Sequence, residues 1–409
     1  MFNFVPGEYP GPSSNGIVIR DMSWKLPKLV PKSGPVILLI LTLGAIGGFA
    51  AVGHLVTRYD LNQQARGRKL YRQGIQDADA GDYDDAIEAF RAALTCDSGN
   101  SQYQLSLARA LRDSNNPAHL DEAESYLIAL WQRTPQDAAV NLALARVAAH
   151  RGSIDDAIRY YHNAMYGVWS SDADANRNRV RLELIQYLLK KNARAQADSE
   201  LIALAASLPA SVGEHLQAAQ LFMQAQDYGG AIAQYRYVLH FQPSNAKAMS
   251  GAGQAAYLMG DYTEAQHYLR GAVAADPSDT KARQLLATTD EVLRFDPFHS
   301  HISDAERNRR IAIDFAQSED RLQSCARQTG VTLDSGNAPP TPLAKLQSLW
   351  NSTKPDLKRL QSASETDLPD TIMDVVFQIE QQTAATCGQP QGSDLALLLI
   401  SEKREAATP

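Results

Sequence analysis

The chain has 409 residues, of which 44% are hydrophobic and 21% are charged, which is ordinary for a globular protein. This length is enough for two or three domains. Residues 1–72 carry a net charge of +6, so the total of −7 leaves −13 for residues 73–409. The acidic part lacks the excess of basic residues that nucleic-acid binding needs, and we therefore expect no nucleic-acid partner.

The N-terminal region combines a proline- and glycine-rich stretch with a long apolar run. Residues 1–34 are expected to form a disordered tail, because their composition buries little surface. No Asp, Glu, Lys or Arg occurs from Gly34 to Thr57. The 21 residues from Val36 to Val56 are long enough as a helix to cross a hydrocarbon core of roughly 30 Å. The sequence predicts a single transmembrane helix over residues 35–58, which would contact the lipid bilayer.

Two alternatives concern this apolar run. A cleaved signal peptide, with a site near Gly48-Phe49-Ala50, is less favoured because both the tail and the run are long for one. Gly44 and Gly48 form a GxxxG pair through which two copies could pack as a homodimer. A glycine-rich but monomeric span is the other interpretation. Residues Asp60–Arg72 are expected to continue as helix.

One alanine recurs along the next two hundred residues, and larger apolar residues follow it at fixed distances. A large side chain comes four residues after each alanine, and proline comes twelve residues after four of them. Alanine permits a close helix crossing, and proline ends a helix. The spacings are 37, 34, 40, 34 and 34 residues. The six positions are Ala86, Ala123, Ala157, Ala197, Ala231 and Ala265.

This period and its helix-turn-helix pattern resemble the tetratricopeptide repeat (TPR) family. The resemblance implies an all-α solenoid, with six repeats over about residues 67–279. With Thr280–Phe295 as a lone capping helix, the solenoid is expected to occupy residues 60–296. The resemblance to the TPR family also implies that the first helix of each repeat lines a concave groove that binds a protein or peptide.

The polar residues expected to face this groove are the candidate partner-binding residues. Arginine and glutamine side chains could hold acidic groups and peptide backbone, although a solvated face without a ligand is the alternative. Tyr71 and Ile75 replace the Lys and Asn that some TPR domains use to bind a partner's C-terminal carboxylate, so that ligand is not expected. The candidates are Arg68, Tyr71, Arg112, Arg146, Arg179, Gln186, Gln220, Lys247 and Gln254. The insertion Tyr166–Asn176 contains Trp169, which we expect to be packed rather than to serve as a contact point.

Residues 297–409 are expected to form a small helical domain. Ser303 and Glu306 predict a capping box at the start of a helix that runs to about Gln328. Loop residues 331–342, a helix over Leu343–Trp350, an amphipathic helix over Pro369–Cys387 and a last short helix capped by Ser393 follow.

The sequence contains few residue patterns typical of catalytic or metal-binding sites. It contains no Gly-rich phosphate loop, HExxH, CxxC or GxSxG motif, and His299 and His301 lack a third metal ligand at useful spacing. We therefore expect no enzyme, no cofactor and no metal site. Cys325 and Cys387 lie on apolar helix faces, which favours a disulfide over two free thiols, and a disulfide needs an oxidising compartment.

The sequence thus predicts a membrane-tethered TPR scaffold that assembles a complex at the membrane. We expect a single-pass protein of the cytoplasmic (inner) membrane of a bacterial envelope, with its soluble part in the periplasm. A structural subunit of an envelope complex, or an enzyme subunit with its site in the C-terminal domain, remains the alternative.

Overall fold

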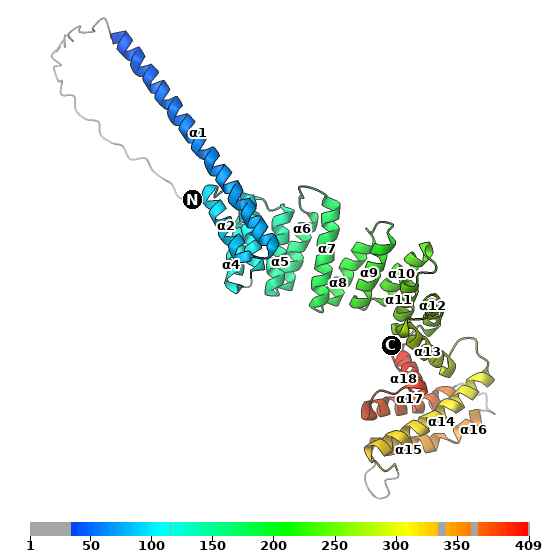
Figure 1. Cartoon of the computed structure of the whole chain (residues 1–409). Helices are drawn as coiled ribbons and strands as arrows, with labels where there is room; N and C mark the ends of the chain where they lie inside the picture. The colour runs from blue at the N-terminus through cyan, green and yellow to red at the C-terminus, as the bar shows by residue number, and fades with distance from the viewer. Residues whose placement is uncertain (1–33, 115, 334–340, 361–366, 408–409) are drawn as a thin grey trace, which may run out of the picture. The chain divides into compact units, whose positions relative to one another are not determined.

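The computed structural model describes residues 34–114, 116–333, 341–360 and 367–407 (Figure 1). Throughout these residues every regular element is an α-helix, and the β-pairing is limited to an isolated bridge between Asp137 and Val168. The predicted all-α class is confirmed. The predicted tail over residues 1–34 lies outside the described residues, apart from Gly34.

The first twelve helices alternate along the chain as first and second helices joined by short connections. The first helices of the pairs are α1 (Gly34–Ala80), α3 (Ser101–Asp113), α5 (Ala138–Arg151), α7 (Ala173–Lys190), α9 (Val212–Ala225) and α11 (Ala246–Leu258). The second helices are α2 (Tyr83–Cys96), α4 (Pro117–Arg133), α6 (Ile154–Tyr166), α8 (Arg194–Ala205), α10 (Tyr228–Phe241) and α12 (Tyr262–Ala275). The chain divides into two compact units, one ending at Ala110 and the other beginning at Leu111, which are described separately.

The recurring alanines occupy the tightest positions of the second helices. Each of the six has an exposed fraction of 0%. The large residues four positions later are at most 5% exposed, which is the burial expected of side chains on one helix face. Helices α11 and α12 also approach closely at a glycine, because a Cβ added to Gly253 on α11 would lie 2.7 Å from Leu269 Cγ on α12. The alanines that recur in the sequence therefore mark the positions where the second helices are packed most closely.

The turns between the helices of a pair use the left-handed backbone region. Gly81, Gly152 and Gly260, each five residues before a recurring alanine, have φ of +88°, +78° and +75°. Asn192 and Gln226, which also lie five residues before the recurring alanine, adopt φ of +58° and +65° without glycine's freedom. The turn geometry therefore persists where the sequence signal for it is missing.

Helix α1 is continuous over 47 residues, from the apolar run into the first helix pair. By length and composition it could cross a membrane, and its apolar window is 0% buried. Its second half packs against α2: a Cβ on Gly74 would lie 2.7 Å from the ring of Phe90. The predicted continuation through Arg72 is confirmed and extends to Ala80.

Six further helices complete the second unit. They are α13 (Thr280–Phe295), α14 (Asp304–Thr329), α15 (Pro342–Thr353), α16 (Asp356–Leu360), α17 (Leu368–Cys387) and α18 (Gly392–Ala407). We call α14–α18 the C-terminal bundle. Ser303 caps α14 by accepting from the Glu306 N–H at 3.2 Å. The predicted capping box is only half formed, because the Glu306 carboxylate accepts hydrogen bonds from Arg309 and Arg310 instead.

The C-terminal bundle packs against α13, and against Tyr262 of α12, through a shared apolar core. That core joins Val292 and Phe295 of α13 to residues of α14, α15, α17 and α18. The Lys403 ammonium on α18 lies 5.5 Å from the centre of the Tyr262 ring on α12. α18, predicted as a short helix beginning near Ser393, has 16 residues and begins at Gly392.

Candidate functional site

The candidate site is the solvent-facing side of the first helices, which we call the first-helix face. In the second unit Arg179, Gln186, Gln220 and Lys247 are exposed, and Gln254 is half-buried. In the first unit Arg68 is exposed. Their exposure leaves these side chains accessible to solvent, and their role in binding a partner stays a prediction.

Tyr71 is held within the first unit rather than presented to solvent. Its ring stacks on Tyr103 with a centroid distance of 4.8 Å and lies 5.6 Å from Phe90. Its hydroxyl shares a hydrogen bond of 3.2 Å with Ser106. These contacts explain why tyrosine occupies this position, and they leave it half-buried.

Arg112, on α3, is bound by the residue that follows it. Its Nε and Nη2 donate to the two carboxylate oxygens of Asp113 at 2.7 and 2.6 Å. The side chain is only 10% exposed, and Nη1 is buried without a hydrogen-bond partner in the described part of the chain. The guanidinium charge is therefore already paired.

Arg146, on α5, is part of a three-residue network. Its Nε and Nη2 donate to Glu183 Oε1 and Oε2 on α7, both at 2.7 Å, and the buried Tyr161 hydroxyl on α6 donates to Glu183 Oε1 at 2.8 Å. We call these three residues the Arg146–Glu183–Tyr161 cluster. It links three successive helices by charge-assisted hydrogen bonds.

The electrostatics of this cluster follow from its geometry. Burial alone would raise the pKa of the Glu183 carboxyl, but hydrogen bonding and charge attraction from Arg146 lower it. Burial, and then the negative charge of Glu183, raise the pKa of the Tyr161 hydroxyl. Glu183 thus remains ionised and holds Arg146 in place.

Apolar side chains flank two of the candidate glutamines. Leu182 and Leu189 precede and follow Gln186 on one face of α7, and Leu216 and Met223 stand in the same relation to Gln220 on α9. All four are partly buried against the neighbouring core. Around Gln186 and Gln220 the first-helix face thus combines amide groups with apolar surface.

The insertion between α6 and α7 is folded onto the second unit. Trp169 Nε1 donates to the Ala164 carbonyl at 3.0 Å, and its ring packs against the local core, as expected. Val168 pairs with residues 136–138 through two backbone hydrogen bonds of 2.8 and 3.2 Å. A Cβ on Gly167 would lie 2.7 Å from the Asn163 carbonyl oxygen, so only glycine fits there.

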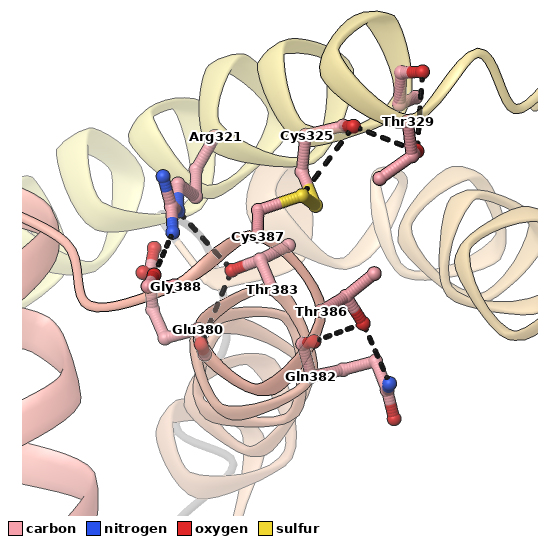
Figure 2. The surroundings of a disulfide bond; sticks show 10 residues. Arg321, Cys325, Thr329, Glu380, Gln382, Thr383, Thr386, Cys387 and Gly388 are labelled. Carbon is pink, nitrogen blue, oxygen red and sulfur yellow. Dashed lines mark hydrogen bonds between the residues drawn. A yellow bond between two sulfur atoms is a disulfide. The ribbon is translucent and has the colours of Figure 1, made fainter.

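Cys325 and Cys387 are joined by a disulfide between α14 and α17 (Figure 2). Their Cα atoms are 5.8 Å apart. Beside it, Arg321 donates to the Thr383 hydroxyl at 3.2 Å and to the Gly388 carbonyl at 3.1 Å. Cys96 is a free thiol of intermediate exposure.

Sequence reasoning missed the acidic partners of the site. Asp113 directly follows its partner Arg112, which is a local signal, whereas Glu183 is 37 residues from its partner Arg146. It also missed Asp314 and Glu380, which interrupt the apolar faces of α14 and α17. Across the described residues, no three His, Cys, Asp or Glu side chains are placed to hold a metal ion.

Comparisons with known proteins find similarity to tetratricopeptide repeats in two parts of the chain. Residues 74–174 match the family model of the cytochrome c-type biogenesis protein H TPR domain, and residues 222–288 match a tetratricopeptide repeat model. A tetratricopeptide repeat protein 9C from Xenopus tropicalis is 41% identical over 56 residues, which are 14% of this chain and 32% of that protein.

Solved structures similar to this chain include two bacterial proteins. Pseudomonas aeruginosa PilF has 16% identity and a TM-score of 0.36, with 55% of this chain and 99% of that chain covered. The C-terminal part of a TPR repeat-containing protein from Cytophaga hutchinsonii has 17% identity and a TM-score of 0.41, with 60% and 97% covered.

The family models match residues on both sides of a gap at 175–221, so the count of six repeats stays a prediction. The recurring alanine is nevertheless buried in each of the six second helices, inside and outside the matched ranges. The TPR fold is a helical scaffold for protein–protein interaction. On the pattern, the helix pairs and the family matches together, the chain is a tetratricopeptide repeat protein.

Proposed function

We propose that the protein is a membrane-tethered TPR scaffold that binds a segment of a partner protein on its first-helix face. The observation that carries the proposal is the glutamine that recurs at the equivalent position of three successive first helices, exposed at Gln186 and Gln220 and half-buried at Gln254. Polar residues at one register of several helices suit a ligand that runs along the repeats. Assembly of a complex at the membrane would follow from the tether.

The chemistry around Gln186 and Gln220 favours a partner segment that offers peptide backbone and apolar side chains. Carboxamides both donate and accept hydrogen bonds, so Gln186 and Gln220 suit peptide backbone. The flanking leucines and methionine suit apolar side chains. The charges of Arg112 and Arg146 are paired with Asp113 and Glu183, which weakens the case for an acidic ligand.

A photocrosslinking experiment tests the binding surface. With benzoylphenylalanine at residue 186 or 220 of the full chain, we expect adducts to one peptide segment in native membranes. The same probe at Gln132 or Gln196, which are exposed on the second helices α4 and α8, is the matched control and should give none. Adducts only from the control positions would move the site to the second-helix side.

Once the segment is identified, affinity provides the quantitative test. Gln186→Ala with Gln220→Ala should weaken binding by about 5- to 150-fold, because each lost hydrogen bond is worth about 0.5–1.5 kcal/mol. The variant Gln132→Ala with Gln196→Ala should bind like wild type.

The tether and its sidedness are a separate part of the proposal. The apolar part of α1 would span the inner membrane, and the disulfide favours an oxidising, periplasmic location for the C-terminal bundle. After permeabilisation of the outer membrane, an impermeant protease should degrade the repeats of spheroplasts. Protection of the repeats, together with two free thiols at Cys325 and Cys387, would place them in the cytoplasm.

A second candidate function is that of a structural subunit of an envelope complex. The match of residues 74–174 to a TPR domain of cytochrome c-type biogenesis protein H favours an assembly role of this kind. A permanent subunit would co-purify in fixed stoichiometry and would not exchange with added partner peptide.

A further inference from the structure

Two carboxylic acids lie inside the C-terminal bundle without a partner. Asp314 on α14 and Glu380 on α17 both have an exposed fraction of 0%. None of their four carboxyl oxygens has a hydrogen-bond partner in the part of the chain that the structure describes. An ionised carboxylate is costly to bury unpaired, so the closed bundle favours the neutral acids.

The charged groups near the pair do not compensate it. The positive charge of Arg310 lowers the pKa of Asp314, and the negative charge of Asp296 raises it. The negative charges of Asp394 and Asp314 raise the pKa of Glu380, and the positive charge of Arg321 lowers it. Both arginines hydrogen-bond other groups. Arg310 donates to Glu306 and to two backbone carbonyls, and Arg321 donates to Thr383 and Gly388 (Figure 2).

Apart from Asp394, the charged side chains of the other helices described next lie against other groups. On α15 and α16, Lys354 lies over the Trp350 ring and Arg359 pairs with Asp356. On α18, Lys403 lies over Tyr262 and Arg404 pairs with Asp370. Burial, as the main cause, raises the pKa of Asp314 to about 8 and that of Glu380 to about 9.

We propose that the C-terminal bundle is a pH-sensitive clamp on α13, closed while Asp314 and Glu380 are protonated and opened by their ionisation. Ionisation would place two negative charges in the core between α14 and α17. The core that they disrupt also holds α18 and α13 together, so opening loosens the packing of α18 on α13. The disulfide lies about three turns after Asp314 and about two turns after Glu380, and it keeps α14 and α17 tethered.

The direction of the pH effect follows from proton linkage. In the open bundle the carboxyls ionise near their ordinary pKa values of 3.8 and 4.5. The closed bundle binds their protons up to about pH 8 and about pH 9. The open state is therefore favoured increasingly as pH rises between these limits, by up to about tenfold per pH unit for each carboxyl.

The test uses the full chain labelled with 5-fluorotryptophan, because Trp350 lies in this core and stacks on Phe315 at 4.8 Å. The opening constant is measured from the Trp350 fluorine signal in a fixed, mild urea concentration at pH 5 to 8. We expect it to rise at least 30-fold across this range. A smaller rise overturns the proposal.

Neutral variants assign the effect to the pair. Asp314→Asn with Glu380→Gln should remove most of the pH dependence, and each single variant should remove part of it. Asp320→Asn, an exposed change on α14, is the matched control and should keep the wild-type profile. If the double variant does not fold, the single variants decide. Wild-type pH dependence in both single variants overturns the proposal.

Discussion

Loss of the Cys325–Cys387 disulfide is expected to lower the free energy of unfolding of the C-terminal bundle by about 4 kcal/mol. The bond closes a loop across 62 positions of sequence, and in the chain-entropy model this constraint destabilises the unfolded chain by that amount. Urea unfolding followed through the Trp350 fluorine signal measures the difference between oxidised and reduced wild-type chain.

The variant Cys325→Ala with Cys387→Ala should resemble the reduced wild-type chain and should not respond to reductant. Cys96→Ala provides the control, because its thiol is free. A difference below about 1 kcal/mol between oxidised and reduced chain would mean that the core alone stabilises the bundle.

Glu183→Ala is expected to cost about 2–3 kcal/mol, because hydrogen bonds to charged groups are worth about 1.5–3 kcal/mol. The variant leaves the guanidinium of Arg146 and the buried hydroxyl of Tyr161 without their acceptor. Thermal or urea unfolding of the full chain, read from the helix signal in circular dichroism, measures this loss. Glu88→Ala, an exposed acidic residue on α2, should change stability by less than about 0.5 kcal/mol.

A compensated variant separates the loss of the network from the loss of a carboxylate. Arg146→Met, Glu183→Leu and Tyr161→Phe together remove every polar group of the cluster, so no buried group is left unsatisfied. The triple variant should be more stable than Glu183→Ala. If it is less stable, the cluster contributes net stability beyond the satisfaction of its own polar groups.

The helix pairs were predictable because their signals are local. Ala157 and Tyr161 lie one turn apart on α6, so one short stretch of sequence reveals both the close crossing and the side chain that fills the space beside it. The turn after α9 was harder to predict. Gln226 takes the left-handed conformation because the packed helices impose it, although its side chain does not favour that region.

The candidate site was predictable only in part. Register places Arg146 on the first-helix face, but Glu183 is 37 residues away on another helix, and register does not specify that the two meet. Arg112 shows the same limit at short range, since its partner is the adjacent Asp113. The disulfide was easier to anticipate because only two cysteines lie beyond the repeats. Asp314 and Glu380 were missed because acidic residues beside apolar ones are usually solvated.

The continuity of α1 has a consequence if its apolar run spans a membrane, as proposed. With no joint between the apolar run and the helix that packs on α2, the two ends of α1 share one rotational phase. Each residue added between Thr57 and Arg66 would rotate the first helix pair by about 100° about the axis of α1. Seven added residues would nearly restore its original orientation. If the span is anchored in lipid, the length of α1 therefore sets the direction, around the helix axis, in which Arg68 points.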